Sequence, residues 1–149
     1  MNNIEKLKEL LPFSKKLNVL FVEDNEEVKA QILKMLSNFF EKIDTATNGQ
    51  EALEMYNNFE EINQDFYDIV ITDLSMPKLN GIDLCKEIIN IKNDQVILVI
   101  SAYSHPENLF ELINLGVAKF IQKPIEQKKV LETIISIIEL CQNGNKRFC

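Results

Sequence analysis

The amino-acid sequence predicts an α/β fold: five parallel strands in one doubly wound sheet, helices on both faces, and a short extra helix at the N-terminus. Short apolar runs alternate five times with helical apolar patterns between residues 17 and 141, an order that favours a parallel sheet with right-handed crossovers. The first, third and fourth runs are almost continuously hydrophobic, as expected for strands covered on both faces. The chain has 149 residues, 46% of them hydrophobic, which suffices for one domain with its own core.

Each predicted strand is followed by a predicted helix, recognised by apolar residues that recur at helical spacing. The strands are expected at residues 17–22, 43–46, 69–72, 96–100 and 118–121. The apolar helix stripes are Val28, Ile32, Met35, Leu36 and Phe39; Ala52, Leu53 and Tyr56; Ile82, Cys85, Ile88 and Ile89; Leu109, Leu112 and Ile113; and Val130, Ile134, Ile137, Ile138 and Cys141.

Local signals place several helix ends. Asn48-Gly49 and Asn80-Gly81 are expected to begin the second and third helices of this series. His105-Pro106 is expected to open the fourth, because proline suits a first helical turn, and Gly116 stands where a C-terminal cap belongs.

The first residues of the chain form a separate pattern. Ile4, Leu7, Leu10 and Leu11 predict a short amphipathic helix before Pro12. A helix this short is marginal in isolation, so a helix packed on the domain or fraying from it is favoured over a coiled-coil or linker role. We therefore expect an N-terminal extension over residues 1–15, a domain over 16–141 and a polar tail over 142–149.

Composition excludes several classes of protein. The net charge of −7 argues against direct binding of nucleic acid or of an anionic membrane. Cys85, Cys141 and Cys149 form an odd set without CxxC spacing, which indicates a reducing compartment; the first two fall on apolar helix faces, where cysteine packs as a small hydrophobe. No signal peptide or apolar run of the ~20 residues needed for a membrane span is present. We expect a cytoplasmic protein.

Polar residues gather where the predicted strands end. Glu23 and Asp24 follow the first strand, Asp73 follows the third, Ser101 follows the fourth and Lys123 follows the fifth. In an open parallel sheet the functional site lies outside the carboxyl ends of the strands. Taken singly, each residue has a purely structural explanation, such as an acid at a helix start or a surface lysine. Because all five residues fall at the same edge of the predicted sheet, a functional site there is favoured over separate structural roles.

The residue types at this edge suit phosphoryl transfer. Three neighbouring carboxylates raise one another's pKa values unless a cation intervenes, and hard oxygen ligands beside a phosphate select Mg²⁺. One carboxylate can act as the nucleophile and form an aspartyl phosphate. Lys123 can pair with a phosphoryl oxygen, and the Ser101 hydroxyl can donate a further hydrogen bond.

Longer motifs around these residues resemble the CheY-like response regulator receiver family of two-component signalling, over about residues 16–140. They are the acidic pair Glu23-Asp24, Asp73-Leu74-Ser75-Met76-Pro77 with Asn80-Gly81, Ser101-Ala102, and Lys123-Pro124. The run Asp–x–x–Met–Pro–x–x–x–Gly is highly characteristic of receivers. The resemblance implies a flavodoxin-like (βα)₅ fold and a phosphoprotein that accepts a phosphoryl group in a histidine-to-aspartate phosphorelay.

The resemblance also implies a role for each matching residue. Asp73 is the phosphoacceptor. Mg²⁺ is held by Asp24 and Asp73 directly, by Glu23 through water, and by the backbone carbonyl of Ser75. The remaining roles are the switch hydroxyl for Ser101, the switch aromatic for Phe120, the phosphate-pairing cation for Lys123, and a candidate cis peptide for Lys123-Pro124.

Two departures from the family pattern affect the expected partners. Phe120 lacks the hydroxyl of the tyrosine often found there, and Glu132-Thr133-Ile134 replaces the arginine pattern of the branch with a winged-helix DNA-binding domain. The resemblance implies a sensor histidine kinase or phosphotransfer protein as phosphodonor. It implies a downstream protein or output domain on the face formed by residues 105–115, the fifth strand and 126–141. The chain is then a signalling phosphoacceptor, not an enzyme beyond its own phosphotransfer and dephosphorylation.

Other classes of protein fit the sequence less well. A haloacid-dehalogenase-like phosphatase needs a second Asp two residues after its nucleophile, where Ser75 stands, and neither G-x-G-x-x-G nor a P-loop is present. A receiver that binds without phosphorylation is disfavoured because the acidic and lysine set is complete. A receiver module excised from a hybrid kinase or from a regulator with an output domain stays open.

Overall fold

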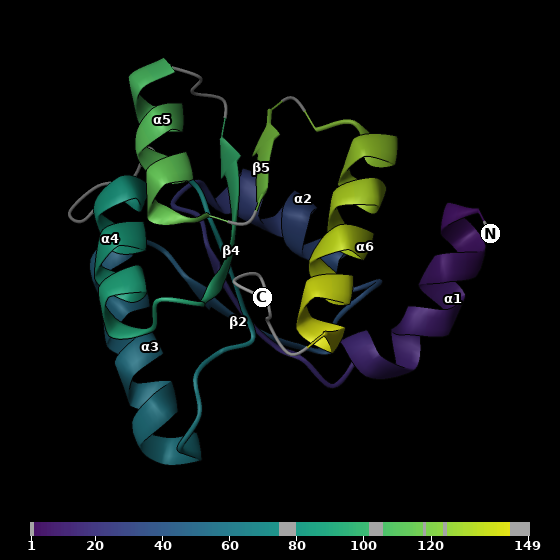
Figure 1. Ribbon diagram of the computed structural model, residues 1–149, viewed down its shortest axis with the longest axis horizontal. Coiled ribbons are helices and arrows are strands. Elements are labelled where there is room, and N and C mark those ends of the chain that lie inside the picture. The colour runs from purple at the N-terminus through teal and green to yellow at the C-terminus, as the bar shows by residue number, and fades with distance from the viewer. Residues whose placement is uncertain (1, 75–79, 102–105, 118, 124, 144–149) are drawn as a thin grey trace.

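The structure, a computed structural model, describes residues 2–74, 80–101, 106–117, 119–123 and 125–143. Helices and strands alternate along these residues after an initial helix (Figure 1). In chain order they are α1 (Asn3–Ser14), β1 (Asn18–Val22), α2 (Glu26–Leu36), β2 (Lys42–Ala46), α3 (Gly49–Asn63), β3 (Ile69–Thr72), α4 (Gly81–Ile91), β4 (Val96–Ser101), α5 (Pro106–Leu115), β5 (Lys119–Gln122) and α6 (Gln127–Gln142).

The strands form one parallel sheet in the order β2-β1-β3-β4-β5. This order reverses direction between β1 and β3, as in flavodoxin-like doubly wound folds. β3 and β4 are buried along their whole length and β1 along nearly all of it, whereas the edge strands β2 and β5 keep exposed residues. The predicted fold class is confirmed, and each strand begins and ends within one residue of its expected bounds.

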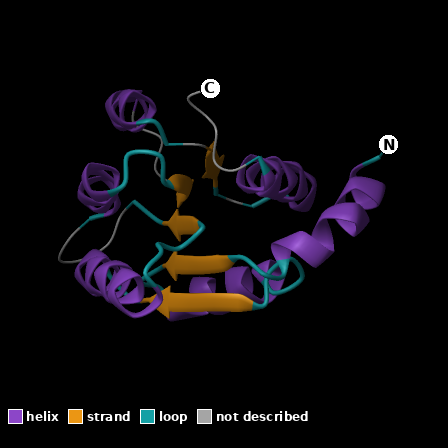
Figure 2. Ribbon diagram, turned by 60° about the horizontal axis from the view of Figure 1, so that its bottom comes forward, coloured by secondary structure: helices purple, strands orange, loops and turns teal. Residues whose placement is uncertain are grey.

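Two apolar layers cover the sheet. Successive strand residues point to opposite faces, so Val19 and Phe21 join a cluster with α1, α2 and α6, while Leu20 and Val22 join a second cluster with α3, α4 and α5. The same division of helices is visible on the two sides of the sheet in Figures 1 and 2. Fully buried Cys85 lies in the second cluster and half-buried Cys141 packs against the first, as expected for cysteines that pack as small hydrophobes.

Asparagine side chains begin the three helices that follow β1, β2 and β3. Asn25, Asn48 and Asn80 each accept a hydrogen bond from the backbone N–H three residues later, which satisfies one of the donors left free in a first turn. At the other end of a helix, Gly116 has a φ of 85°, and its N–H donates to the carbonyl of Ile113. The predicted helix starts at Asn48 and Asn80 and the glycine cap are confirmed.

The predicted inner face of α5 is wrong at one residue. Leu112 is buried, but Ile113 is 63% exposed, and Phe110 is also 69% exposed. Residues three apart share a helix face, whereas neighbours differ by about 100° around the axis. Leu115, not Ile113, therefore packs with Leu112 against the core. The side chain of Leu109 lies outside the described part of the structure.

α1 packs against α6 on the outside of the domain (Figure 1). The prediction that it ends before Pro12 is wrong, because the helix continues through this residue to Ser14. Ser14 is fully buried, and its hydroxyl donates to the backbone carbonyl of Phe39 at 2.7 Å. This tertiary contact and the packing of Leu10 offset the hydrogen bond that proline cannot make. Ile4, expected on the apolar stripe, is 61% exposed.

Among the described residues, no helix combines the length and the apolar character needed to cross a membrane.

Replacing Ser14 by alanine should lower the free energy of unfolding by about 1–2 kcal/mol, because the buried carbonyl of Phe39 loses its hydroxyl donor. Ser37→Ala is the matched control, since the Ser37 hydroxyl also donates to a backbone carbonyl, that of Lys34, but on the exposed surface. That change should stay within about 0.5 kcal/mol. Urea unfolding followed by far-UV circular dichroism measures both. Equal losses in the two variants would mean that Ser14 does not anchor α1.

Candidate functional site

The carboxyl ends of the strands meet at one edge of the sheet and carry the predicted site residues. Backbone hydrogen bonds tie these residues to neighbouring strands: the N–H of Glu23 donates to Ala46, that of Asp73 to Val22, and that of Lys123 to Ser101. Their main chains are thus held as rigidly as the strands themselves. The structure places the main chains of these residues at the edge where the sequence analysis expects them, and their roles stay predictions.

Three carboxylates converge at this edge. One oxygen from each of Glu23, Asp24 and Asp73 lies within 4.8 Å of the others. Glu23 is 2% exposed and Asp73 is 7% exposed, while Asp24 is half-buried. Clustered carboxylates with little solvent around them repel one another unless a cation is near.

Lys123 supplies a positive charge to the cluster. Its Nζ donates to Oε1 of Glu23 at 3.0 Å and lies 4.0 Å from Oδ2 of Asp73. Three carboxylates against one ammonium group leave an excess of two negative charges. The oxygen ligands and this excess fit a hard divalent cation such as Mg²⁺. The close Glu23–Lys123 pair was not predicted, because sequence spacing does not show which side chains from different strands are long enough to touch.

Burial raises the pKa of Glu23 above its ordinary value, and the negative charge of Asp73 raises it further. The hydrogen bond from Lys123 and the one from the N–H of Asn25 act in the opposite direction and do not cancel the effect of burial. The charged form of Glu23 is therefore less stable relative to its protonated form than in water. Such perturbed carboxylates are typical of sites that bind a cation or another charged group.

One oxygen of Asp73 is already engaged. Oδ1 accepts a hydrogen bond from the N–H of Leu74 at 2.9 Å, which leaves Oδ2 as the oxygen that faces Lys123. The start of α4 lies directly behind this segment, because the N–H of Gly81 donates to the Leu74 carbonyl at 2.8 Å. The two oxygens of Asp73 are therefore not equivalent.

Ser101 and Phe120 lie on the same face of the sheet. Val99 pairs with Phe120 and Ser101 pairs with Gln122 in the register of β4 and β5, so alternate residues place both side chains toward α3, α4 and α5. Ser101 is buried, and Phe120 is half-buried against the same apolar cluster as Leu112.

Several predicted features lie wholly or partly outside the described residues. Among them are the Ser75 carbonyl, Met76-Pro77, Ala102, His105, the Lys123-Pro124 peptide and Cys149.

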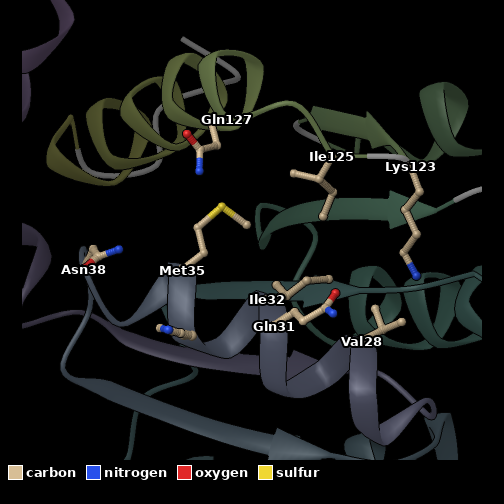
Figure 3. A pocket seen from close by; sticks show the side chains of 9 residues that line it. Val28, Gln31, Ile32, Met35, Asn38, Lys123, Ile125 and Gln127 are labelled. Atoms are coloured by element: carbon tan, nitrogen blue, oxygen red, sulfur yellow. The ribbon is translucent and has the colours of Figure 1, made fainter.

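A groove of about 570 Å³ opens beside the site between α2 and the segment after β5. Val28, Ile32 and Met35 line its α2 side, and Ile125 faces them from the other side (Figure 3). Lys123 stands at one end of this groove, so the groove leads to the carboxylate cluster. No sequence pattern predicts this groove, because the residues that line its two walls are distant along the chain.

Comparison with known proteins identifies the family. The profile described as "Response regulator receiver domain" matches residues 19–135. Chemotaxis protein CheY of Treponema pallidum is 34% identical over 122 residues, 81% of this chain and 82% of that protein. CheY of Thermotoga maritima is 34% identical over 117 residues, 78% of this chain and 92% of that protein. The structure of a CheX-CheY-BeF3-Mg+2 complex from Borrelia burgdorferi matches with a TM-score of 0.72 and 32% identity, covering 81% of this chain and 88% of that chain.

The raised pKa of Glu23 predicts a pH-dependent effect of Glu23→Gln on the metal-free protein. Folded wild type holds the Glu23 proton more tightly than the unfolded chain does, so this group's contribution to stability is greatest below the ordinary pKa of 4.5 and is lost as the pH rises through the raised value. The variant has no such loss. The free energy of unfolding of the variant minus that of wild type should therefore increase from acidic to neutral pH.

Urea unfolding in EDTA, at a pH near the ordinary pKa of glutamate and at neutral pH, measures this difference. The acidic point is the internal control, because wild-type Glu23 is protonated to a greater extent there than at neutral pH and is then closer to glutamine. A difference that shrinks toward neutral pH would contradict the assigned direction.

Proposed function

This chain belongs to the response regulator receiver family, and on that premise we propose that Asp73 is the residue that accepts the phosphoryl group. The observation that carries the proposal is the environment of Oδ2 of Asp73. Oδ2 faces Lys123, the Asp73 carboxylate lies in a cluster with the carboxylates of Glu23 and Asp24, and Oδ1 is occupied by a backbone N–H. A single oxygen is thus presented to an incoming phosphorus atom.

The acceptor reaction needs little covalent chemistry from the protein. Oδ2 of Asp73 forms a bond to phosphorus as the bond from phosphorus to the donor breaks, and the donor group leaves with the bonding electrons. What the site must add is alignment and neutralisation of the negative charge on the phosphoryl oxygens. Lys123 supplies one positive charge for this purpose.

Mg²⁺ is the cation proposed for the acidic cluster. By the resemblance to receivers, Asp24 and Asp73 would hold it directly and Glu23 through water, and the Ser75 carbonyl, which lies outside the described residues, would be the remaining protein ligand. When bound, the ion neutralises charge on the phosphoryl group and its donor. The excess negative charge among the described carboxylates supports this role, because a divalent cation balances it.

Lys123 changes partner in the proposed reaction. Before phosphorylation its ammonium group is paired with Glu23 at 3.0 Å and stands 4.0 Å from Oδ2 of Asp73. A phosphoryl group on Oδ2 places new anionic oxygens between them. Lys123 then pairs with one of these oxygens, and Mg²⁺ held at the acidic cluster would balance the negative charge of Glu23.

The proposed phosphodonor is a sensor histidine kinase or a phosphotransfer protein, and the groove beside Lys123 gives it an apolar surface next to the acceptor (Figure 3). The chain acts as a signalling protein whose own chemistry is limited to taking up and losing this phosphoryl group. The free cysteines Cys85 and Cys141 and the family support a cytoplasmic location.

The proposed output is a change of the face formed by α5, β5 and α6. A phosphoryl group on Asp73 offers strong acceptor oxygens to the Ser101 hydroxyl. Movement of Ser101 opens space on the α5 side of the sheet, and half-buried Phe120 turns inward to fill it, because voids in a close-packed interior are unfavourable. The placement of both side chains on this face supports the proposal.

Acetyl phosphate and Mg²⁺ should add one base-labile phosphoryl group to wild type and none to Asp73→Asn. Asp24→Ala or EDTA should slow the reaction about a hundredfold or more, because the acceptor then lacks its cation. Phosphate-affinity electrophoresis measures the yield over time. Asp83→Asn is the matched control, since Asp83 is an exposed acid in the first turn of α4, and it should react like wild type. Equal labelling of wild type and Asp73→Asn would refute the proposal.

Ser101→Ala should still accept the phosphoryl group but fail to transmit it. In wild type, beryllofluoride with Mg²⁺ should shift backbone amide signals around Asp73 and also across α5, β5 and α6 in two-dimensional NMR. In the variant the shifts around Asp73 should persist and those of the α5–β5–α6 face should shrink. If the amide signals of α5, β5 and α6 did not shift in wild type, the domain would be a phosphoacceptor without this switch.

A further inference from the structure

The carbonyl oxygen of Asp73 is held by two residues outside the acidic cluster. Thr72, the last residue of β3, is 0% exposed, and its hydroxyl donates to this oxygen at 2.8 Å. Gly81, the first residue of α4, packs so closely that a β-carbon there would overlap the same oxygen. The N–H of Gly81 also donates to the carbonyl of Leu74 at 2.8 Å. The peptide between Asp73 and Leu74 is thereby confined.

The orientation of this peptide determines which carboxylate oxygen is free. The Asp73 carbonyl and the Leu74 N–H belong to one planar unit and point in opposite directions. That N–H donates to Oδ1 at 2.9 Å, and Oδ2 is left 4.0 Å from Nζ of Lys123. A rotation of the peptide would release Oδ1 and let the carboxylate turn away from Lys123.

The geometry points to Thr72 as a positioning residue for phosphoryl acceptance, an inference that rests on the proposed role of Asp73. The Thr72 hydroxyl fixes the carbonyl of Asp73, the fixed peptide aims the Leu74 N–H at Oδ1, and Oδ2 is kept as the nucleophile. A β-branched side chain has few χ1 rotamers, so threonine holds its hydroxyl in place at small entropic cost. Thr72 touches neither the phosphoryl group nor the cation.

The step that this positioning serves is simple with acetyl phosphate. Oδ2 forms a bond to phosphorus, the bond from phosphorus to the acetyl oxygen breaks, and acetate leaves with the electron pair. No proton or further reactant is required. The rate depends on how well one oxygen is aligned with the bond that breaks, and misplacement by about 1 Å can cost on the order of a hundredfold.

A purely structural role must be separated from a positioning role, because any buried hydroxyl needs a hydrogen-bond partner. Thr72→Val removes the hydroxyl and keeps the shape, and Thr72→Ser keeps the hydroxyl. Ser14→Ala is the matched control, since it deletes another buried hydroxyl bonded to a backbone carbonyl at the far end of the domain. All three are compared with wild type at saturating Mg²⁺.

Thr72→Val should react with acetyl phosphate about tenfold more slowly than wild type, while Thr72→Ser and Ser14→Ala stay within about twofold. The second readout is the amide proton shift of Leu74 without phosphate, which reports its hydrogen bond to Oδ1. This signal should move upfield in Thr72→Val and stay in place in Thr72→Ser.

A wild-type rate and an unchanged Leu74 signal in Thr72→Val would overturn the inference. So would a serine variant as slow as the valine variant, or a Ser14→Ala variant slowed to the same degree. If wild type itself fails to react, the proposed phosphoacceptor role of Asp73 is wrong. The amide signal of Leu74 in the Thr72 variants still decides whether Thr72 positions this peptide.

Discussion

The site depends on two nearly buried carboxylates that share one ammonium group. Glu23 and Asp73 are almost without solvent, and Lys123 reaches both from the far edge of the sheet. With Asp24 close by, negative charge exceeds positive charge. In the metal-free protein the pKa of Glu23 is raised, first by burial and then by the negative charge of Asp73, and a divalent cation would balance the excess negative charge. Charge imbalance thus makes the site responsive to what binds there.

The fold holds this imbalance because the groups that carry it cannot move apart. Backbone hydrogen bonds from neighbouring strands fix Glu23, Asp73 and Lys123 at the carboxyl edge of the sheet, and apolar layers on both faces stabilise the strands. Thr72 and Gly81 add a finer constraint on the main chain of Asp73. The electrostatic repulsion between the carboxylates is therefore not relieved by movement of the main chain. It favours the binding of a cation, which reduces it.

The sheet and the positions of the site residues could be predicted from the sequence, because buried parallel strands are continuous apolar runs and the strand-end rule places polar residues at one edge. Three features could not. Ile113 fits a helical stripe by spacing, but only the packing of α5 decides which side of that stripe is covered. α1 continues past Pro12 because of tertiary contacts made by Ser14. The Glu23–Lys123 pair depends on side-chain reach between residues 100 positions apart.

The central claim is that one oxygen of Asp73 receives the phosphoryl group. Borohydride reduces an aspartyl phosphate to homoserine, so treatment of the phosphorylated protein followed by peptide mass spectrometry identifies the acceptor directly. The account predicts homoserine at position 73 and at no other aspartate, and, at early times, at least about a hundredfold less of it when Mg²⁺ is withheld. Homoserine at position 24 or elsewhere, or a stable phosphate on a hydroxyl residue, would contradict it.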